Sequence, residues 1–139
     1  TDFDVIRSDI NAIAKNVEMQ EVLYDPKFAA YFAAKLQDED GLTMVEMPQT
    51  SNRFTLPIIE IENLVLTGDL EHDDNPAVAW MISNVVMRES KFSGLRHPTK
   101  ERQESKIDAA VALIMAMGRA LTIEPIENLD DFLSNPIIA

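Results

Sequence analysis

Cysteine is absent from this sequence of 139 residues, and long apolar runs and cations are scarce in it. Without cysteine the chain can form no disulfide, thiolate metal site or thiol nucleophile, which fits a reducing compartment. No apolar run reaches the roughly 20 residues that a membrane-spanning helix needs, and no signal peptide precedes Thr1. We therefore expect one soluble, intracellular chain that is long enough to bury a core.

The shortage of cations is uneven along the chain. Twelve Lys and Arg residues stand against 24 Asp and Glu residues, and the net charge of −12 argues against a general nucleic-acid-binding surface. Half of the basic residues nevertheless lie between positions 88 and 106, and we call this set the basic strip: Arg88, Lys91, Arg96, Lys100, Arg102 and Lys106. The strip favours contact with a polyanion over one small surface, although a solvated loop would have the same charge.

Apolar periodicity and turn residues predict an alternation of helices and strands. The first part of the chain should hold a helix, a strand, a helix and a strand, over about residues 3–16, 21–24, 26–37 and 42–47. The last three of these form a βαβ unit, whose strands are parallel and whose crossover is right-handed. The second part should hold a helix from Leu56 to Gly68, a helix from Asn75 to Val85, an extended hairpin over 84–103 and a helix over 106–121.

Asp25 lies at the carboxyl end of the first predicted strand, directly before Pro26. Ligands gather at the carboxyl ends of parallel strands in open α/β sheets, because helix N-termini present unpaired amides there. An aspartate before a proline is also a common helix cap. Both interpretations of Asp25 stay open at this point.

Asp108 precedes the most apolar helical run of the chain, Ala109–Leu121, and follows the basic strip. A carboxylate at the start of such a helix, beside cations, would suit a metal-dependent enzyme that acts on a polyanion. Ser105 and Asp108 also have the spacing of a capping box, which would explain both residues without any function. Spacing alone does not separate the two interpretations.

Three motifs follow one another along the chain. They are Tyr24-Asp25-Pro26, the string from His72 through Asn75-Pro76 and Trp80 to Val86, and Glu104-Ser105-Lys106-Ile107-Asp108 with the apolar helix after it. In this order, over about residues 2–121, they closely resemble the carboxyl-terminal nuclease domain of the large terminase subunits of tailed phages. The last motif is the most specific, whereas Tyr-Asp-Pro alone would carry no weight.

The resemblance implies an α/β, ribonuclease H-like fold and a nuclease that hydrolyses double-stranded DNA with two Mg²⁺ or Mn²⁺ ions. Hard oxygen ligands suit such cations, which activate a water and stabilise the leaving oxygen. Asp25 and Asp108 match two of the family's catalytic, metal-binding acids, and residues 88–103 match a hairpin near its DNA-binding face. The resemblance therefore makes the basic strip a DNA-binding surface. Lys106 could contact a phosphate or simply be exposed, and we expect His72 to be structural and Trp80 to lie in the core.

The sequence also departs from the family. The family's first metal-binding aspartate and the strands around it have no counterpart, because Asp2, Asp4 and Asp9 fall on or just before the first helix. No Walker phosphate loop is present either. We therefore expect a fold truncated at its N-terminus, with two parallel strands plus a hairpin, flanked by helices. We also expect weak metal binding, little or no cleavage by the chain alone, and self-association through the exposed sheet edge.

Two further expectations concern organisation and partners. We divide the chain into a partial nuclease domain at 1–121 and an acidic tail at 122–139. The family's partners are double-stranded DNA, the terminase small subunit and the portal protein, and its place is the cytoplasm of a bacterial host that carries the prophage. The alternative function is a noncatalytic interaction module, in which the acidic surface or the tail docks a partner such as the portal. The apolar residues of the tail could equally pack on their own domain: Leu129, Phe132, Leu133, Ile137 and Ile138.

Overall fold

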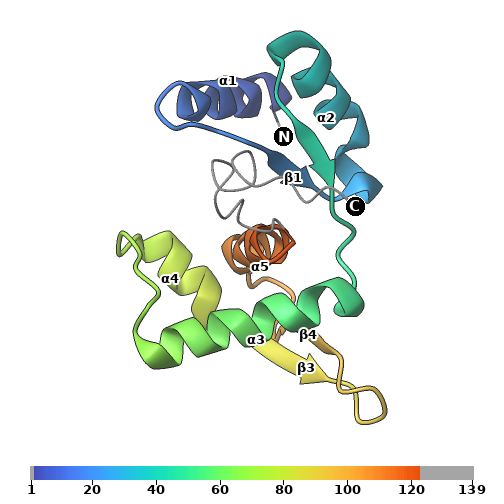
Figure 1. Ribbon diagram of the computed structural model, residues 1–139, viewed down its shortest axis with the longest axis vertical. Helices are drawn as coiled ribbons and strands as arrows, with labels where there is room; N and C mark the ends of the chain where they lie inside the picture. The colour runs from blue at the N-terminus through green and yellow to red at the C-terminus, as the bar shows by residue number, and fades with distance from the viewer. Residues whose placement is uncertain (1, 123–139) are drawn as a thin grey trace, which may run out of the picture.

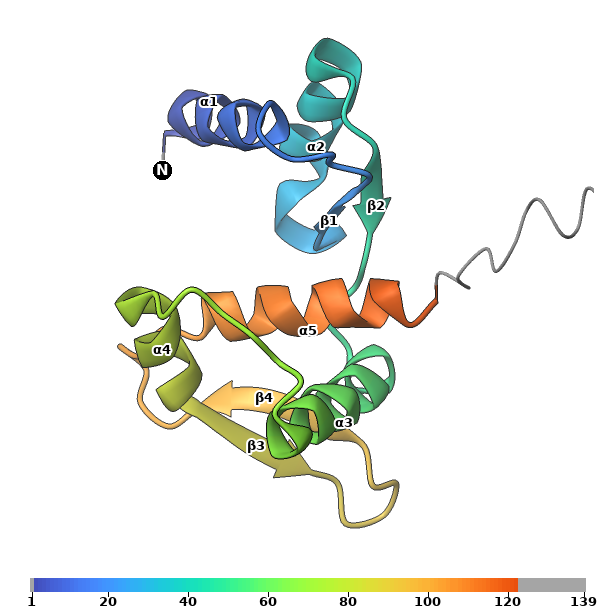
Figure 2. The ribbon, with the colours of Figure 1, turned by 60° about the vertical axis from the view of Figure 1, so that its left-hand side comes forward.

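The computed structural model describes residues 2–122 of the chain. The N-terminal unit comprises α1, β1, α2 and β2, and the C-terminal unit comprises α3, α4, the hairpin β3–β4 and α5 (Figure 1). In both ribbon views α5 lies between the N-terminal unit and the rest of the C-terminal unit (Figure 2). The last helix of the sequence thus occupies the middle of the molecule.

The N-terminal unit confirms the predicted helix and βαβ unit. Its elements are α1 (Phe3–Ala14), β1 (Val22–Tyr24), α2 (Pro26–Asp40) and β2 (Met44–Glu46). The strands β1 and β2 are parallel, with Val22 opposite Met44 and Tyr24 opposite Glu46. Gly41 ends α2 in the left-handed conformation, at φ 71°, which a residue without a Cβ adopts readily. The paired aromatic rings of Phe3 and Phe32, 5.1 Å apart, hold α1 against α2.

The C-terminal unit contains α3 (Ser51–Thr67), α4 (Pro76–Ser83), β3 (Val85–Glu89), β4 (Arg96–Lys100) and α5 (Asp108–Ala120). The hairpin is confirmed, because β3 and β4 pair in antiparallel register from Val85 opposite Lys100 to Glu89 opposite Arg96. It is fixed to α3 by a hydrogen bond of 2.9 Å from the Arg96 amide to the Thr55 hydroxyl.

Two features of this unit differ from those predicted from the sequence. The helix α3 begins at Ser51, five residues before the predicted start at Leu56, and Pro57 lies inside it. Proline costs one helical hydrogen bond there, but the extra turn buries Phe54 completely and seats the Pro57 ring in the core. The prediction that Trp80 lies in the core was wrong, because its side chain is half exposed. The short helix α4 contacts α5 through Met81 instead, whose sulfur accepts from the Ala109 amide at 3.3 Å.

The core joins the two units around α5. Its buried side chains come from the end of β2, from α3 and from α5, with Leu23 of β1 packed against them: Met47, Phe54, Ile58, Ile114 and Met115. Arg119, near the end of α5, donates two hydrogen bonds to Glu21, which precedes β1, at 2.5 and 2.7 Å. The position of α5, and with it the position of Asp108, is therefore set by contacts with both units.

Within the described part of the chain, no helix is both long and apolar enough to cross a membrane. The predicted acidic tail lies outside the described residues from position 123 onward. The division at residue 121, and the choice between a docked and a packed tail, therefore stay predictions.

Candidate functional site

Asp25 caps α2. Its Oδ1 atom accepts a hydrogen bond from the Lys27 amide at 3.0 Å, and Pro26 occupies the first helical position. The capping interpretation of Asp25 is thus confirmed, and it leaves the second carboxylate oxygen available to a ligand. Asp25 lies at the carboxyl ends of the parallel strands, as the sequence predicted, beside the register pair Tyr24 and Glu46.

The neighbouring pair Tyr24 and Glu46 is a feature that the sequence analysis missed. The Tyr24 hydroxyl donates to the Glu46 carboxylate at 3.0 Å. Partial burial, followed by this contact with Glu46, raises the pKa of Tyr24. A signal existed in the sequence, since Glu46 ends the second parallel strand just as Tyr24 ends the first. Glu46 thus places a second carboxylate at the same edge as Asp25.

Asp108 has a different local environment. It is the first residue of α5, the cap position is occupied by Ile107, and no side-chain hydrogen bond caps this helix among the described residues. The capping-box interpretation of Ser105 and Asp108 is therefore wrong, because the helix begins two residues too late for Ser105 to cap it. The Asp108 carboxylate is exposed at the positive end of the α5 dipole, and within residues 2–122 it makes no hydrogen bond or ion pair.

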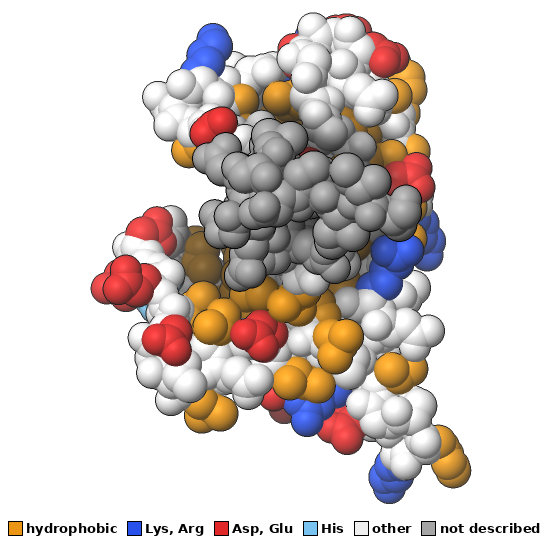
Figure 3. Space-filling view, in the orientation of Figure 1, with side chains coloured by type: hydrophobic (Ala, Val, Ile, Leu, Met, Phe, Trp, Pro, Cys, Tyr) orange, Lys and Arg blue, Asp and Glu red, His pale blue; other side chains and the backbone are white. Residues whose placement is uncertain are grey.

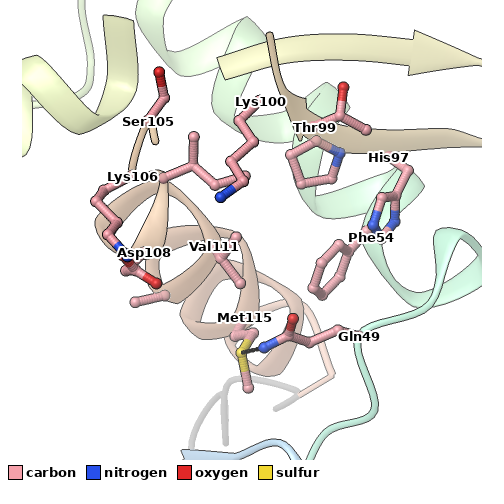
Figure 4. A pocket seen from close by; sticks show the side chains of 13 residues that line it. Gln49, Phe54, His97, Thr99, Lys100, Ser105, Lys106, Asp108, Val111 and Met115 are labelled. Carbon is pink, nitrogen blue, oxygen red and sulfur yellow. Dashed lines mark hydrogen bonds between the residues drawn. The ribbon is translucent and has the colours of Figure 1, made fainter. Parts of the chain in front are cut away.

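A pocket of about 650 Å³ opens beside Asp108, between the start of α5, the end of β4 and the start of α3. Figure 4 shows Asp108 and Lys106 at one side of it, His97 and Phe54 at the other, and the Lys100 ammonium between them in this view. The Lys100 ammonium donates to the Gln103 carbonyl at 2.6 Å, and the Lys106 carbonyl accepts from the Asn84 side chain at 3.1 Å. These bonds fix the loop between the end of β4 and the start of α5, so the pocket combines one carboxylate with two cations and a helix N-terminus.

His97 is a second feature that the sequence analysis missed. Its ring stacks on Phe54, with centroids 5.5 Å apart, and both rings line the pocket. Of the described residues, His97 alone has a buried side-chain polar atom without a hydrogen-bond partner, and that atom is Nδ1. No sequence signal marked this residue, because its position depends on how the hairpin lies against α3.

The structure does not bring the two predicted acids into one pocket. Asp108 lines the pocket described above, and Asp25 does not. Residues 2–122 contain no group of three or more His, Cys, Asp or Glu side chains that could hold a metal ion. The described residues by themselves therefore do not fit the two-metal site that the resemblance implies, and the assignment of Asp25 and Asp108 as metal ligands stays a prediction.

The basic strip divides into three groups. Lys100 and Lys106 line the pocket beside Asp108, and Arg102 lies on the loop between them. Arg88 and Lys91 are exposed on the hairpin. Arg96 instead binds two carboxylates, Glu89 at 3.0 Å and Glu62 at 2.7 Å, and its pKa is raised, first by the hydrogen bond to Glu89 and then by the charge of Glu62. Arg96 thus has a clear structural role in holding the hairpin to α3.

His72 belongs to the turn before α4. Its Nδ1 atom accepts from the Asp74 amide at 3.1 Å, and Asp74 takes a positive φ of 55°. This bond shapes the approach to Asn75, whose side chain caps α4 by accepting from the Ala77 amide at 3.0 Å. The contacts of His72 are therefore those of a structural residue.

Comparison with known proteins identifies the family. The chain matches the terminase large subunit endonuclease domain over residues 1–124. It is 36% identical over 135 residues to Protein YmfN of Escherichia coli (strain K12), a match that covers 96% of this chain and 30% of that protein. The fold is similar to that in the crystal structure of the HK97 bacteriophage large terminase, with a TM-score of 0.75 and 24% identity, over 86% of this chain and 25% of that one.

These similarities confirm the resemblance noted in the sequence. The match to the solved terminase concerns the fold, and it confirms the α/β, ribonuclease H-like class. The chain spans less than a third of the length of each of these two relatives. With its family match extending over nearly the whole chain, the protein belongs to the terminase large subunit endonuclease domain family.

Proposed function

We propose that this chain is part of a divalent-metal-dependent DNA endonuclease that cuts concatemeric viral DNA during packaging. The observation that carries the proposal is the environment of Asp108. This carboxylate takes no part in capping, and it faces a pocket with Lys100 and Lys106. In a member of a nuclease family, an acid so placed is suited to bind a metal ion, and the two lysines are suited to bind the phosphates of the substrate.

The proposed ligand set is incomplete in the described residues. Asp25 and Asp108 would be two of its members, and further oxygen ligands are needed because residues 2–122 hold no cluster of three. When bound, Mg²⁺ or Mn²⁺ would supply an activated water and stabilisation of the departing oxygen. We therefore expect the chain alone to bind Mn²⁺ weakly and to cleave DNA little or not at all.

The proposed DNA contacts are Lys100 and Lys106 in the pocket, with Arg102, Arg88 and Lys91 around it. Arg96 is left out of this set because two carboxylates already bind its guanidinium. The pocket is also lined by His97, whose buried Nδ1 atom has no hydrogen-bond partner among residues 2–122. The chain's excess of acid elsewhere would keep DNA away from its other faces.

Assembly is a separate part of the proposal. Within residues 2–122 each strand of the parallel pair β1–β2 has one unpaired edge. Such an edge is a template for another strand, which supports self-association or pairing with further parts of a longer polypeptide. The proposed protein partners are the terminase small subunit and the portal. The proposed location is the bacterial cytoplasm. A clean monomer in light scattering at micromolar concentration would contradict the self-association.

Calorimetric titration with Mn²⁺ tests the metal site directly. We expect weak binding by the unaltered chain, loss of the heat of binding in Asp108→Asn, and no change in Asp9→Asn, a matched control on the exposed face of α1. Equal binding by all three proteins would remove Asp108 from the ligand set. Strong Mg²⁺-dependent nicking of plasmid DNA that is lost in Asp108→Asn would refute the expected inactivity and support the catalytic role of this residue.

A further inference from the structure

The tip of the β3–β4 hairpin combines an aromatic side chain with positive charge. Phe92 has a relative exposure of 102%, so its ring contacts nothing else in the described molecule, and Lys91 precedes it. The hairpin from residue 85 to residue 100 carries four Lys and Arg residues and one Glu, whereas the whole chain has a net charge of −12. In Figure 3 a hydrophobic and a cationic side chain project from the hairpin tip, at the lower right of the view.

The tip is a rigid turn. The Ser90 amide donates to the Leu95 carbonyl at 2.9 Å, and the Gly94 amide donates back to the Ser90 carbonyl at 2.8 Å. The Ser93 amide also donates to the Ser90 hydroxyl at 3.3 Å. Gly94 takes a φ of 65°, a conformation in which other residues are strained. The backbone that carries Phe92 is therefore fixed before binding, and only the exposed ring itself has to be ordered when a ligand binds.

The base of the hairpin is fixed as well. Arg96 joins it to α3 through Glu62 at 2.7 Å, and the Arg96 amide bonds to Thr55 at 2.9 Å. The tip thus keeps a constant relation to the pocket, which β4 lines from His97 to Lys100. Four residue steps of strand from Arg96 to Lys100 span roughly 14 Å. With the turn added, the distance from Phe92 to Lys100, the last β4 residue that lines the pocket, is on the order of half a turn of duplex DNA.

We propose that Phe92 inserts between base pairs of the duplex that the pocket binds, so that the hairpin tip positions and bends the DNA. This inference rests on the proposed function, because it takes DNA as the polyanion. A phenyl ring has no hydrogen-bonding group and must enter an apolar space, and the cations beside it call for an anionic partner. Duplex DNA offers both, since apolar side chains can open a base step while Lys and Arg bind the adjacent phosphates.

Insertion of Phe92 should make binding depend on the sequence of the DNA. Base steps of the pyrimidine–purine type, TA above all, unstack most readily. A duplex with a central TA step should therefore bind more tightly than one with a stiff A-tract at the same place, and the difference should disappear in Phe92→Ala. Lys91→Ala should weaken binding to both duplexes alike, because a phosphate contact does not depend on the base step.

The test uses the full chain and short duplexes that carry 2-aminopurine at the central step. We expect the unaltered chain to raise 2-aminopurine fluorescence and Phe92→Ala to abolish the rise, with about tenfold weaker binding. Lys91→Ala should keep the rise at saturation but lower the slope of log affinity against log salt by about one. Leu66→Ala, which removes a similarly exposed apolar side chain on α3, is the matched control and should behave as the unaltered chain.

The outcomes separate the two proposals. If the chain binds duplex DNA and Phe92→Ala binds it equally well, the insertion is wrong while the proposed function stands. If the unaltered chain binds no DNA in any salt, both are overturned. If Phe92 proves necessary for binding anionic lipid vesicles and not for binding DNA, the tip belongs to a different class of interaction and the insertion is again wrong.

Discussion

Asp25 and Asp108 each lie at the start of a helix, but only the Asp25 carboxylate caps its helix. Asp25 accepts the Lys27 amide at 3.0 Å, whereas Asp108 occupies the first helical position of α5 without a capping bond. An acid in that position gains only the interaction with the helix dipole, which amounts to a few tenths of a kcal/mol when exposed. The contribution of each residue to stability should therefore be unequal.

The first prediction follows from this difference. In the absence of metal, Asp25→Ala should lower the free energy of unfolding by about 1 kcal/mol, because a helix cap is lost. Asp108→Ala should lower it by less than about 0.5 kcal/mol, because only the dipole term is lost. Urea denaturation in the presence of a chelator measures both. A loss for Asp108→Ala as large as that for Asp25→Ala would mean that the carboxylate stabilises the fold, and would weaken its assignment as a ligand.

At the scale of elements, local signals in the sequence predicted most of the fold. The βαβ unit and the hairpin were accessible because their turns use residues with strong preferences, such as Asp25-Pro26 and Ser93-Gly94. The start of α3 was missed because Pro57 looks like a first helical residue, while the burial of Phe54 that extends the helix is a tertiary effect. The pocket could not be predicted for the same reason, because it too depends on tertiary packing. His97 and Asp108 line one pocket only when β4 and α5 are both packed on α3.

The packing of α5 on α3 depends on Gly118. A Cβ added at this position would lie 2.5 Å from the Met47 Cε atom and 3.0 Å from the Pro57 ring. Alanine would gain up to about 1 kcal/mol in helix propensity. The clash should cost about 1–3 kcal/mol, because the buried Pro57 ring is fixed to the α3 backbone and cannot turn aside, whereas the Met47 Cε atom ends a flexible side chain. Close approach of the two helices therefore explains a glycine in the middle of the most apolar helix.

The second prediction is a net destabilisation in Gly118→Ala of about 1 kcal/mol, measured by thermal or urea unfolding. Met47→Leu removes the atom nearest to the new Cβ, so the double variant should regain part of that loss. Ala116→Gly, an exposed change on the same helix, supplies the propensity term by itself. An increase in stability in Gly118→Ala would show that the two helices are farther apart than the contact distances indicate.

At the scale of the whole molecule, one ion pair reaches from the start of β1 to the end of α5, across 98 residues of sequence. Hydrogen bonds from Arg119 are the main cause that lowers the pKa of Glu21, against an opposing effect of partial burial. The Arg119 pKa is raised by the same contact, so the guanidinium stays charged at any pH at which the chain is folded. The protonation of Glu21 alone therefore decides whether this connection between the two units is intact.

The third prediction concerns the pH dependence of this connection. Because the pKa of Glu21 is lower in the folded chain than its ordinary value of 4.5, the stabilisation is complete above about pH 4.5 and is lost as the pH falls through the lowered value. The melting temperature of the unaltered chain should thus exceed that of Glu21→Gln at neutral pH, and the two should converge in acid.

Glu18→Gln, three residues earlier and exposed, should follow the unaltered chain at every pH. The Arg7–Asp40 pair, whose carboxyl pKa is also lowered, weakens in the same range in all three proteins and cancels from the comparison. A difference between the unaltered chain and Glu21→Gln that persists unchanged at pH 3, or that is absent at pH 7, would show that this ion pair does not hold the N-terminal unit to α5.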